Sequence, residues 1–245
     1  MIPLSELSLI WLVVCLGALV QSAIGFGLAV VVTPLLYLID PSWVPGPIIM
    51  MGLLVSLFTL ARTGFTLQMG ILKPALLGRL PGGVLGTWLL LVASVHWLGL
   101  AIGAIVLMAV WLTHHKVSLA LTGRNLFGAG VISGVFAAIS AMGGPPLALL
   151  LNNNQSAAAM RNTLAGFFVF SAALSLLLLL LAGAFGWDDF FKGLWLIPPV
   201  FIGFVLGDRL VQHVNPDRLK QATLLLCASA GGLLILRSLY YLLTT

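Results

Sequence analysis

Two short segments that combine small residues with hydrogen-bonding groups interrupt apolar sequence about half the chain apart. The first, residues 21–27, reads QSAIGFG, and the second, residues 140–146, reads SAMGGPP. Each follows an apolar stretch and precedes a shorter one. A break in a membrane helix exposes N–H and C=O groups that hydrocarbon cannot satisfy, so protein, water or a ligand must satisfy them. Broken helices at matching positions of two halves therefore predict one shared binding cavity.

The chemistry of both segments suits a small oxyanion. The second helix of each pair is predicted to start near Gly27 and near Pro145, and a helix start carries free N–H groups and a partial positive charge. Glycine allows close approach of the backbone, while serine hydroxyls and a glutamine amide add donors. We predict that the anion is held at these two helix starts, near the membrane midplane. The predicted binding residues are Gln21, Ser22, Gly25, Phe26, Gly27, Ser140, Met142, Gly143, Gly144, Pro145 and Pro146.

Close helix packing is the alternative explanation for glycine in membrane helices. For Gly82, Gly86, Gly203 and Gly207 we prefer it. At the two breaks a role in lining a ligand site is preferred, because prolines directly after paired glycines exceed what packing requires.

Two arginines in or beside predicted spans have two interpretations. Arg79 lies more than one turn inside its helix, and its side chain is predicted to extend to the cytoplasmic face. Arg161 is predicted to anchor a helix at the interface. The alternative for both is a place on the path of the anion.

Acidic residues and histidines are absent from the middle of every predicted span. Since intramembrane carboxylates form proton relays and cation sites, their absence argues against a cation pump. We predict no metal site, no cofactor and no catalytic residues, because the histidines lie at helix ends or links without a metal-ligand spacing.

The composition requires a membrane. Of 245 residues, 61% are hydrophobic and only 7% are charged, whereas a soluble domain carries about 25% charged residues. The basic residues lie in short links, where they set orientation rather than bind nucleic acid. The expected partners are a small anionic substrate and the lipid bilayer. The oligomeric state stays open, with a homodimer as one option.

The predicted fold is an all-α integral membrane protein with two inverted-topology repeats. Each repeat is expected to contain a broken, re-entrant helix pair and three long transmembrane helices. The arms of each broken pair, at about 11–17 residues, are too short for a full span of roughly 20 residues. The broken pairs are placed at 7–38 and 124–151, and the long helices at 43–63, 72–94, 97–113, 156–182, 190–212 and 218–242.

Charge asymmetry gives the orientation of the repeats. The first repeat is predicted at 1–113, a cytoplasmic link at 114–123 and the second repeat at 124–245. With alternate links on one side, nine of the eleven basic residues fall there, which marks that side as cytoplasmic. Both termini then lie on the periplasmic side, and the two repeats run in opposite directions.

The glycine pattern resembles that of the TauE/SafE family of sulfite exporter-like permeases. The similarity lies in Gly130-x-x-x-Gly134 leading to residues 142–146, in the paired helix glycines named above, and in residues 186–188. Phe26 replaces a glycine common in that family, and Ala138 stands where many members carry glycine. The resemblance implies movement of sulfite or small organosulfur anions, such as sulfonates, across a bacterial inner membrane.

The predicted function is therefore secondary transport of a small oxyanion by alternating access, in a multi-pass protein of the cell inner membrane. A passive anion channel is the alternative. A membrane-embedded enzyme is a weaker one, because no nucleophile–base pair or metal cluster lies within the spans.

Overall fold

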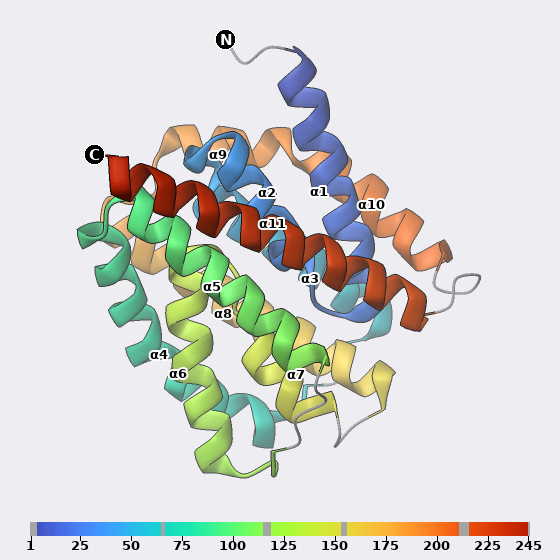
Figure 1. Ribbon diagram of the computed structural model, residues 1–245. Helices are drawn as coiled ribbons and strands as arrows, with labels where there is room; N and C mark the ends of the chain where they lie inside the picture. The colour runs from blue at the N-terminus through green and yellow to red at the C-terminus, as the bar shows by residue number, and fades with distance from the viewer. Residues whose placement is uncertain (1–3, 65–66, 115–118, 153–155, 211–215, 245) are drawn as a thin grey trace.

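The computed structural model describes residues 4–64, 67–114, 119–152, 156–210 and 216–244, and all regular structure in these segments is helical. Figure 1 shows the helices as one bundle, with α11 crossing its front. The elements are α1 (Leu4–Ile24), α2 (Leu28–Ile39), the 3-10 helix η1 (Pro41–Trp43), α3 (Gly46–Thr63), α4 (Met69–Val92), α5 (Val95–His114), α6 (Gly123–Ser140), α7 (Pro145–Asn152), α8 (Ala157–Leu181), α9 (Trp187–Trp195), α10 (Ile197–Leu210) and α11 (Pro216–Thr244).

Six helical segments among the described residues are long and apolar enough to cross a membrane, and the bent pair α9–α10 would make a seventh span. The six segments lie in α1, η1 with α3, α4, α5, α8 and α11. Their outward faces carry many large apolar side chains, as a lipid-facing surface requires. The chain is therefore a multi-pass, all-helical membrane protein.

The predicted long helix at 190–212 is wrong. The chain bends by 42° between α9 and α10, next to Leu196. Pro198 and Pro199 lie in the first turn of α10, where a residue without an N–H is tolerated; inside a continuous helix each would remove a hydrogen bond.

The two broken regions also differ from the prediction. Their first arms are not short, because α1 has 21 residues and α6 has 18, and residues 6–24 of α1 qualify as a span. The second arms are short, with 12 residues in α2 and 8 in α7. Each region therefore joins one long helix, of spanning length in α1 and nearly so in α6, to one short helix, rather than two short arms of a re-entrant hairpin.

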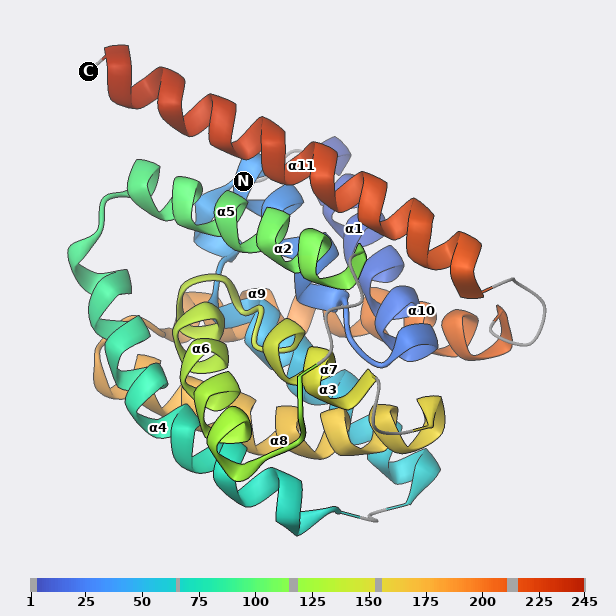
Figure 2. The ribbon, with the colours of Figure 1, turned by 60° about the horizontal axis from the view of Figure 1, so that its bottom comes forward.

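Glycines form the tightest helix contacts, which confirms their predicted packing role. Helix α4 lies along α6, and α1 lies along α10, as Figures 1 and 2 show. A Cβ atom on Gly82 would lie within 3 Å of the backbone of Val131 in α6, and one on Gly203 would lie as close to the backbone of Cys15 in α1. In addition, α5 packs on α11 and α3 packs on α8. Each of these four contacts joins a helix before residue 115 to one after residue 118.

Two polar contacts join segments that lie far apart in the sequence. In one, Arg62 at the end of α3 forms an ion pair with Asp208 near the end of α10. In the other, the Lys192 ammonium group of α9 donates a hydrogen bond of 2.6 Å to the Ser42 hydroxyl in η1. Residues 115–118 of the predicted 114–123 link, and the segments 153–155 and 211–215, lie outside the described residues.

Candidate functional site

The first break requires glycine. After α1 ends at Ile24, Gly25 has a φ of +96° and Gly27 a φ of +133°, conformations that residues with a side chain rarely adopt. The turn directs α2 back toward α1. The side-chain oxygen of Gln21 then accepts a hydrogen bond of 3.2 Å from the N–H of Leu28, the first residue of α2. A side chain of α1 therefore caps the start of α2.

The second break reverses the chain after α6. Ala141 has a φ of +59°, the left-handed conformation that ends many helices. The hydroxyl of Ser133, nearly two turns back in α6, donates a hydrogen bond to the carbonyl oxygen of Gly143. This bond fixes the segment that leads into α7 at Pro145.

The two breaks meet in the bundle. The Thr33 hydroxyl in α2 donates a hydrogen bond of 2.8 Å to the carbonyl oxygen of Ser140 at the end of α6. A Cβ atom on Gly144 would lie 3.4 Å from the Cβ atom of Phe26 and 2.8 Å from the Phe168 ring. The segments that the sequence pairs across half the chain are thus in contact.

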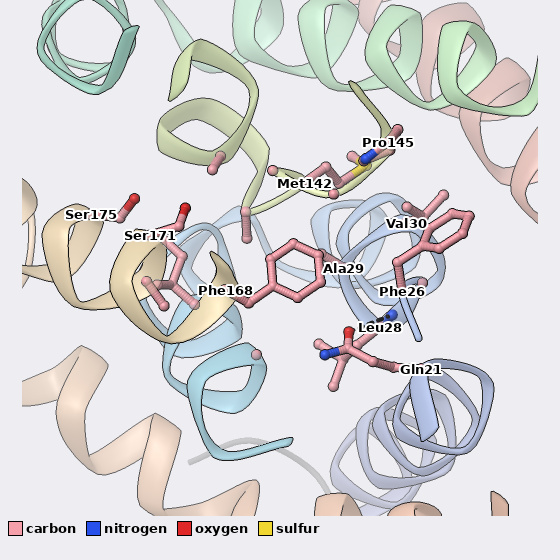
Figure 3. A pocket seen from close by; sticks show the side chains of 18 of the residues that line it. Gln21, Phe26, Leu28, Ala29, Val30, Met142, Pro145, Phe168, Ser171 and Ser175 are labelled. Carbon is pink, nitrogen blue, oxygen red and sulfur yellow. Dashed lines mark hydrogen bonds between the residues drawn. The ribbon is translucent and has the colours of Figure 1, made fainter. Parts of the chain in front are cut away.

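Both breaks line one cavity (Figure 3). Its volume is about 50 Å³, several times the roughly 10–15 Å³ that one water molecule needs. Its walls come from both breaks, α3, α4 and α8, and they are mainly apolar. The polar side chains in the lining are Gln21, Arg79, Ser171 and Ser175.

Arg79 is the charged residue of this cavity wall. Its side chain has 0% exposure, so the prediction that it extends to the cytoplasmic face is wrong. The Nε atom donates a hydrogen bond of 2.6 Å to the Ser171 hydroxyl oxygen, and Nη2 donates one to the Ser175 hydroxyl oxygen. The third nitrogen, Nη1, is buried and has no hydrogen-bond partner within the described part of the chain.

The two helix starts differ in the donors they offer. At α2, the N–H groups of Ala29 and Val30 belong to the first turn, and no backbone acceptor for them occurs among the described residues. At α7, Pro145 and Pro146 carry no N–H, so the first donor inside the helix is Leu147. The start of α2 is therefore richer in donors than the start of α7.

Most of the predicted binding residues lie in the cavity wall. Those that line it are Gln21, Phe26, Gly27, Met142, Gly143, Gly144 and Pro145. In Figure 3, the Phe168 ring extends from α8 toward α2, and the amide group of Gln21 lies below this ring, beside α1. The predicted residues outside the lining are Ser22, Gly25, Ser140 and Pro146.

A local hydrogen bond explains one of these exceptions, and the orientation of the backbone explains another. The Ser140 hydroxyl donates a hydrogen bond of 2.6 Å to the carbonyl oxygen of Phe136 inside α6, so its hydrogen is already used. Gly25 faces Arg161 instead of the cavity, and a Cβ atom on Gly25 would lie 2.5 Å from the Arg161 Cγ atom. The half-buried Arg161 thus packs behind the first break, and it is not among the described lining residues.

Sequence reasoning missed Ser171, Ser175 and Phe168, which line the cavity from α8. A signal was present, because the two serines are four residues apart in the apolar part of the helix that follows Thr163, and so share one face. Figure 3 shows both hydroxyls on the same side of α8. The position of Arg79 between Gly78 and Gly82, on the glycine face of α4, was a second signal.

No group of three histidine, cysteine or carboxylate side chains that could hold a metal ion occurs among the described residues.

Comparison with known proteins identifies one family. The family model described as sulfite exporter TauE/SafE matches residues 10–234, which includes both breaks and every wall of the cavity. Searches of curated proteins and of solved structures gave no significant match.

Proposed function

Because the chain belongs to the sulfite exporter TauE/SafE family, a family of membrane transporters, we propose that it is a secondary transporter of small oxyanions. Sulfite and small organosulfonates are the favoured substrates. The observation that carries this proposal is the cavity between the two breaks, which combines hydrogen-bond donors with a buried guanidinium group.

The cavity offers the chemistry that an oxyanion needs. The first turn of α2 provides N–H groups and the positive end of a helix dipole. The Gln21 side-chain oxygen is occupied by Leu28, which leaves its amide N–H groups available as donors. Gly143 and Gly144 let the wall approach a ligand closely. The apolar remainder of the wall excludes water and strengthens these interactions.

An inverted repeat with alternating access is the mechanism we favour. It is supported by helix packing between the two halves of the chain: α1 packs on α10, and α4 packs on α6. A shift of 118 residues aligns residues 22–25 with 140–143, and a shift of 121 residues aligns Gly82 and Gly86 with Gly203 and Gly207. Under these shifts α1 corresponds to α6 and α4 to α10, so each contact is the counterpart of the other. Repeats at 1–113 and 124–245 would place the site between them. Rocking of one group of helices against another, each group drawn from both repeats, would open the site to alternate sides.

For orientation, we propose that the helix ends around Arg62 and Asp208 face the cytoplasm. Of the nine basic residues that the alternation of links assigns to that side, eight remain once the buried Arg79 is left out, against two on the other side. Both termini would then be periplasmic, in a protein of the bacterial inner membrane.

Flux into proteoliposomes tests the proposal. Purified protein should give saturable uptake of sulfite and of small sulfonates, and internal substrate should accelerate uptake by counterflow. Uptake without saturation or counterflow would indicate a passive channel instead. If no compound of a panel of sulfite, sulfate, sulfoacetate, taurine and thiosulfate enters above the rate of empty vesicles, the proposed function fails.

A further inference from the structure

We propose that Arg79 binds the charged group of the anion directly, together with Ser171 and Ser175, and that the site therefore selects monovalent oxyanions over divalent ones. Alkanesulfonates and hydrogensulfite are monovalent, whereas sulfate is divalent. This inference rests on the proposed transport function and adds to it the binding group and the charge of the substrate.

The geometry of Arg79 leaves one donor group for a ligand. Hydrogen bonds to Ser171 and Ser175 fix the guanidinium plane through Nε and Nη2. Nη1 belongs to a fully buried side chain in the cavity wall and has no partner in the described chain. Because an unpaired charged donor in the interior is strongly unfavourable, the arrangement calls for an acceptor in the cavity.

The serines extend the same site. Each hydroxyl oxygen accepts a hydrogen bond from Arg79, which leaves the hydroxyl hydrogen of each free to point elsewhere. No acceptor for either hydrogen occurs among the described residues. The two hydroxyls and Nη1 together match the several oxygens of a sulfonate group.

Charge balance sets the valence of the ligand. Arg79 is the sole charged side chain among the described residues of the cavity wall. A monovalent anion neutralises it, whereas a divalent anion leaves one negative charge buried without a partner. Since uncompensated charge inside a membrane protein is expensive, the dianion should bind more weakly.

The second half of the chain shows that helix packing does not require an arginine here. Arg79 lies three residues before Gly82, and Val200 lies three residues before Gly203 in the corresponding helix, α10. Val200 is fully buried as well. A valine thus occupies the corresponding place without a buried charge, which argues that Arg79 is retained for a ligand.

Binding of methanesulfonate to the purified protein in detergent tests this inference. We expect methanesulfonate to bind the wild-type protein, measured by calorimetry, and sulfate to compete at least about tenfold less well. Arg79→Met should weaken methanesulfonate binding at least about tenfold, the loss of one charged hydrogen-bonding partner. Arg79→Lys should retain part of the affinity, and Ser171→Ala with Ser175→Ala should reduce it. The matched control is Arg124→Gln, which changes an exposed arginine at the start of α6 and should bind as the wild type does.

Two results would overturn the inference. One is wild-type affinity for methanesulfonate in folded Arg79→Met protein. The other is equal competition by sulfate and methanesulfonate in the wild type, which needs no variant to fold. Either result, with saturable anion flux still present in wild-type vesicles, would reject the role of Arg79 and leave the transport function standing. Absence of saturable anion flux in vesicles with the wild-type protein would instead reject the proposed function.

Discussion

Thr33 in α2 and Ser140 at the end of α6 are joined by a buried hydrogen bond of 2.8 Å, from a hydroxyl to a backbone carbonyl oxygen. This bond links the two breaks and so connects segments more than 100 residues apart. The carbonyl of Ser140 lies where the chain leaves its helix. The bond therefore satisfies an exposed backbone group and holds α2 against the end of α6, beside the cavity.

Replacing Thr33 should loosen this connection. Thr33→Val keeps the shape of the side chain but leaves the Ser140 carbonyl without its donor, which should destabilise the protein by about 1–3 kcal/mol. The measurement is the melting temperature in detergent, with Thr33→Ser as the control that keeps the hydroxyl. Equal melting of Thr33→Val and wild type would show that the bond contributes nothing.

Gly25→Ala should abolish transport. At a φ of +96° an alanine costs about 1–2 kcal/mol, and its Cβ atom would collide with the side chain of Arg161. Gly143→Val should act similarly, since its Cβ atom would lie 3.1 Å from the Ala137 Cβ atom and 3.1 Å from the Ser133 hydroxyl oxygen. Flux into proteoliposomes measures the effect, and monodispersity in detergent checks folding.

The control for these glycine variants is Gly128→Ala. Gly128 lies within α6, and no atom lies within 4 Å of a Cβ atom built there, so alanine should be neutral or stabilise by up to about 1 kcal/mol. If Gly25→Ala transports like Gly128→Ala, the first break tolerates a side chain and its proposed role is incorrect.

Asp208→Asn should leave transport and its pH dependence intact. Asp208 pairs with Arg62 at a helix end, where the side chains are partly exposed and the pair contributes about 0–1 kcal/mol. The measurement is the pH profile of sulfite flux. Loss of proton coupling with substrate binding retained would mark Asp208 as a relay residue.

Cysteine labelling should report the orientation. In a protein lacking Cys15 and Cys227, Asp188→Cys at the start of α9 should react with an impermeant thiol reagent on intact cells. A cysteine at Ser118, outside the described residues, should react only after the membrane is opened. The opposite pattern would reverse the proposed sidedness.

The sequence was sufficient to predict a helical membrane protein, the two breaks and the packing role of four glycines, because these depend on composition and local conformation. Burial of Arg79 was not predictable in the same way. An arginine at this position in the sequence could extend to the membrane surface or be buried in the bundle. Only the position of α8 beside α4 distinguishes the two outcomes. Ser140 illustrates the converse error, since a hydroxyl at a helix end can turn inward to its own backbone. We therefore expect Ser140→Ala to alter binding less than Ser171→Ala.

The packing of α1 on α10 and of α4 on α6 has a consequence for motion. In each tight pair, one helix comes from the first half of the chain and the other from the second, with glycine bringing their backbones into contact. The helices of such a pair cannot separate without losing their closest contacts, so each pair should move as a single rigid body. The boundary between moving parts would then run between the pairs, through the cavity, and not at the middle of the polypeptide. Cutting the chain between residues 115 and 118 would leave the α1–α10 pair and the α4–α6 pair intact.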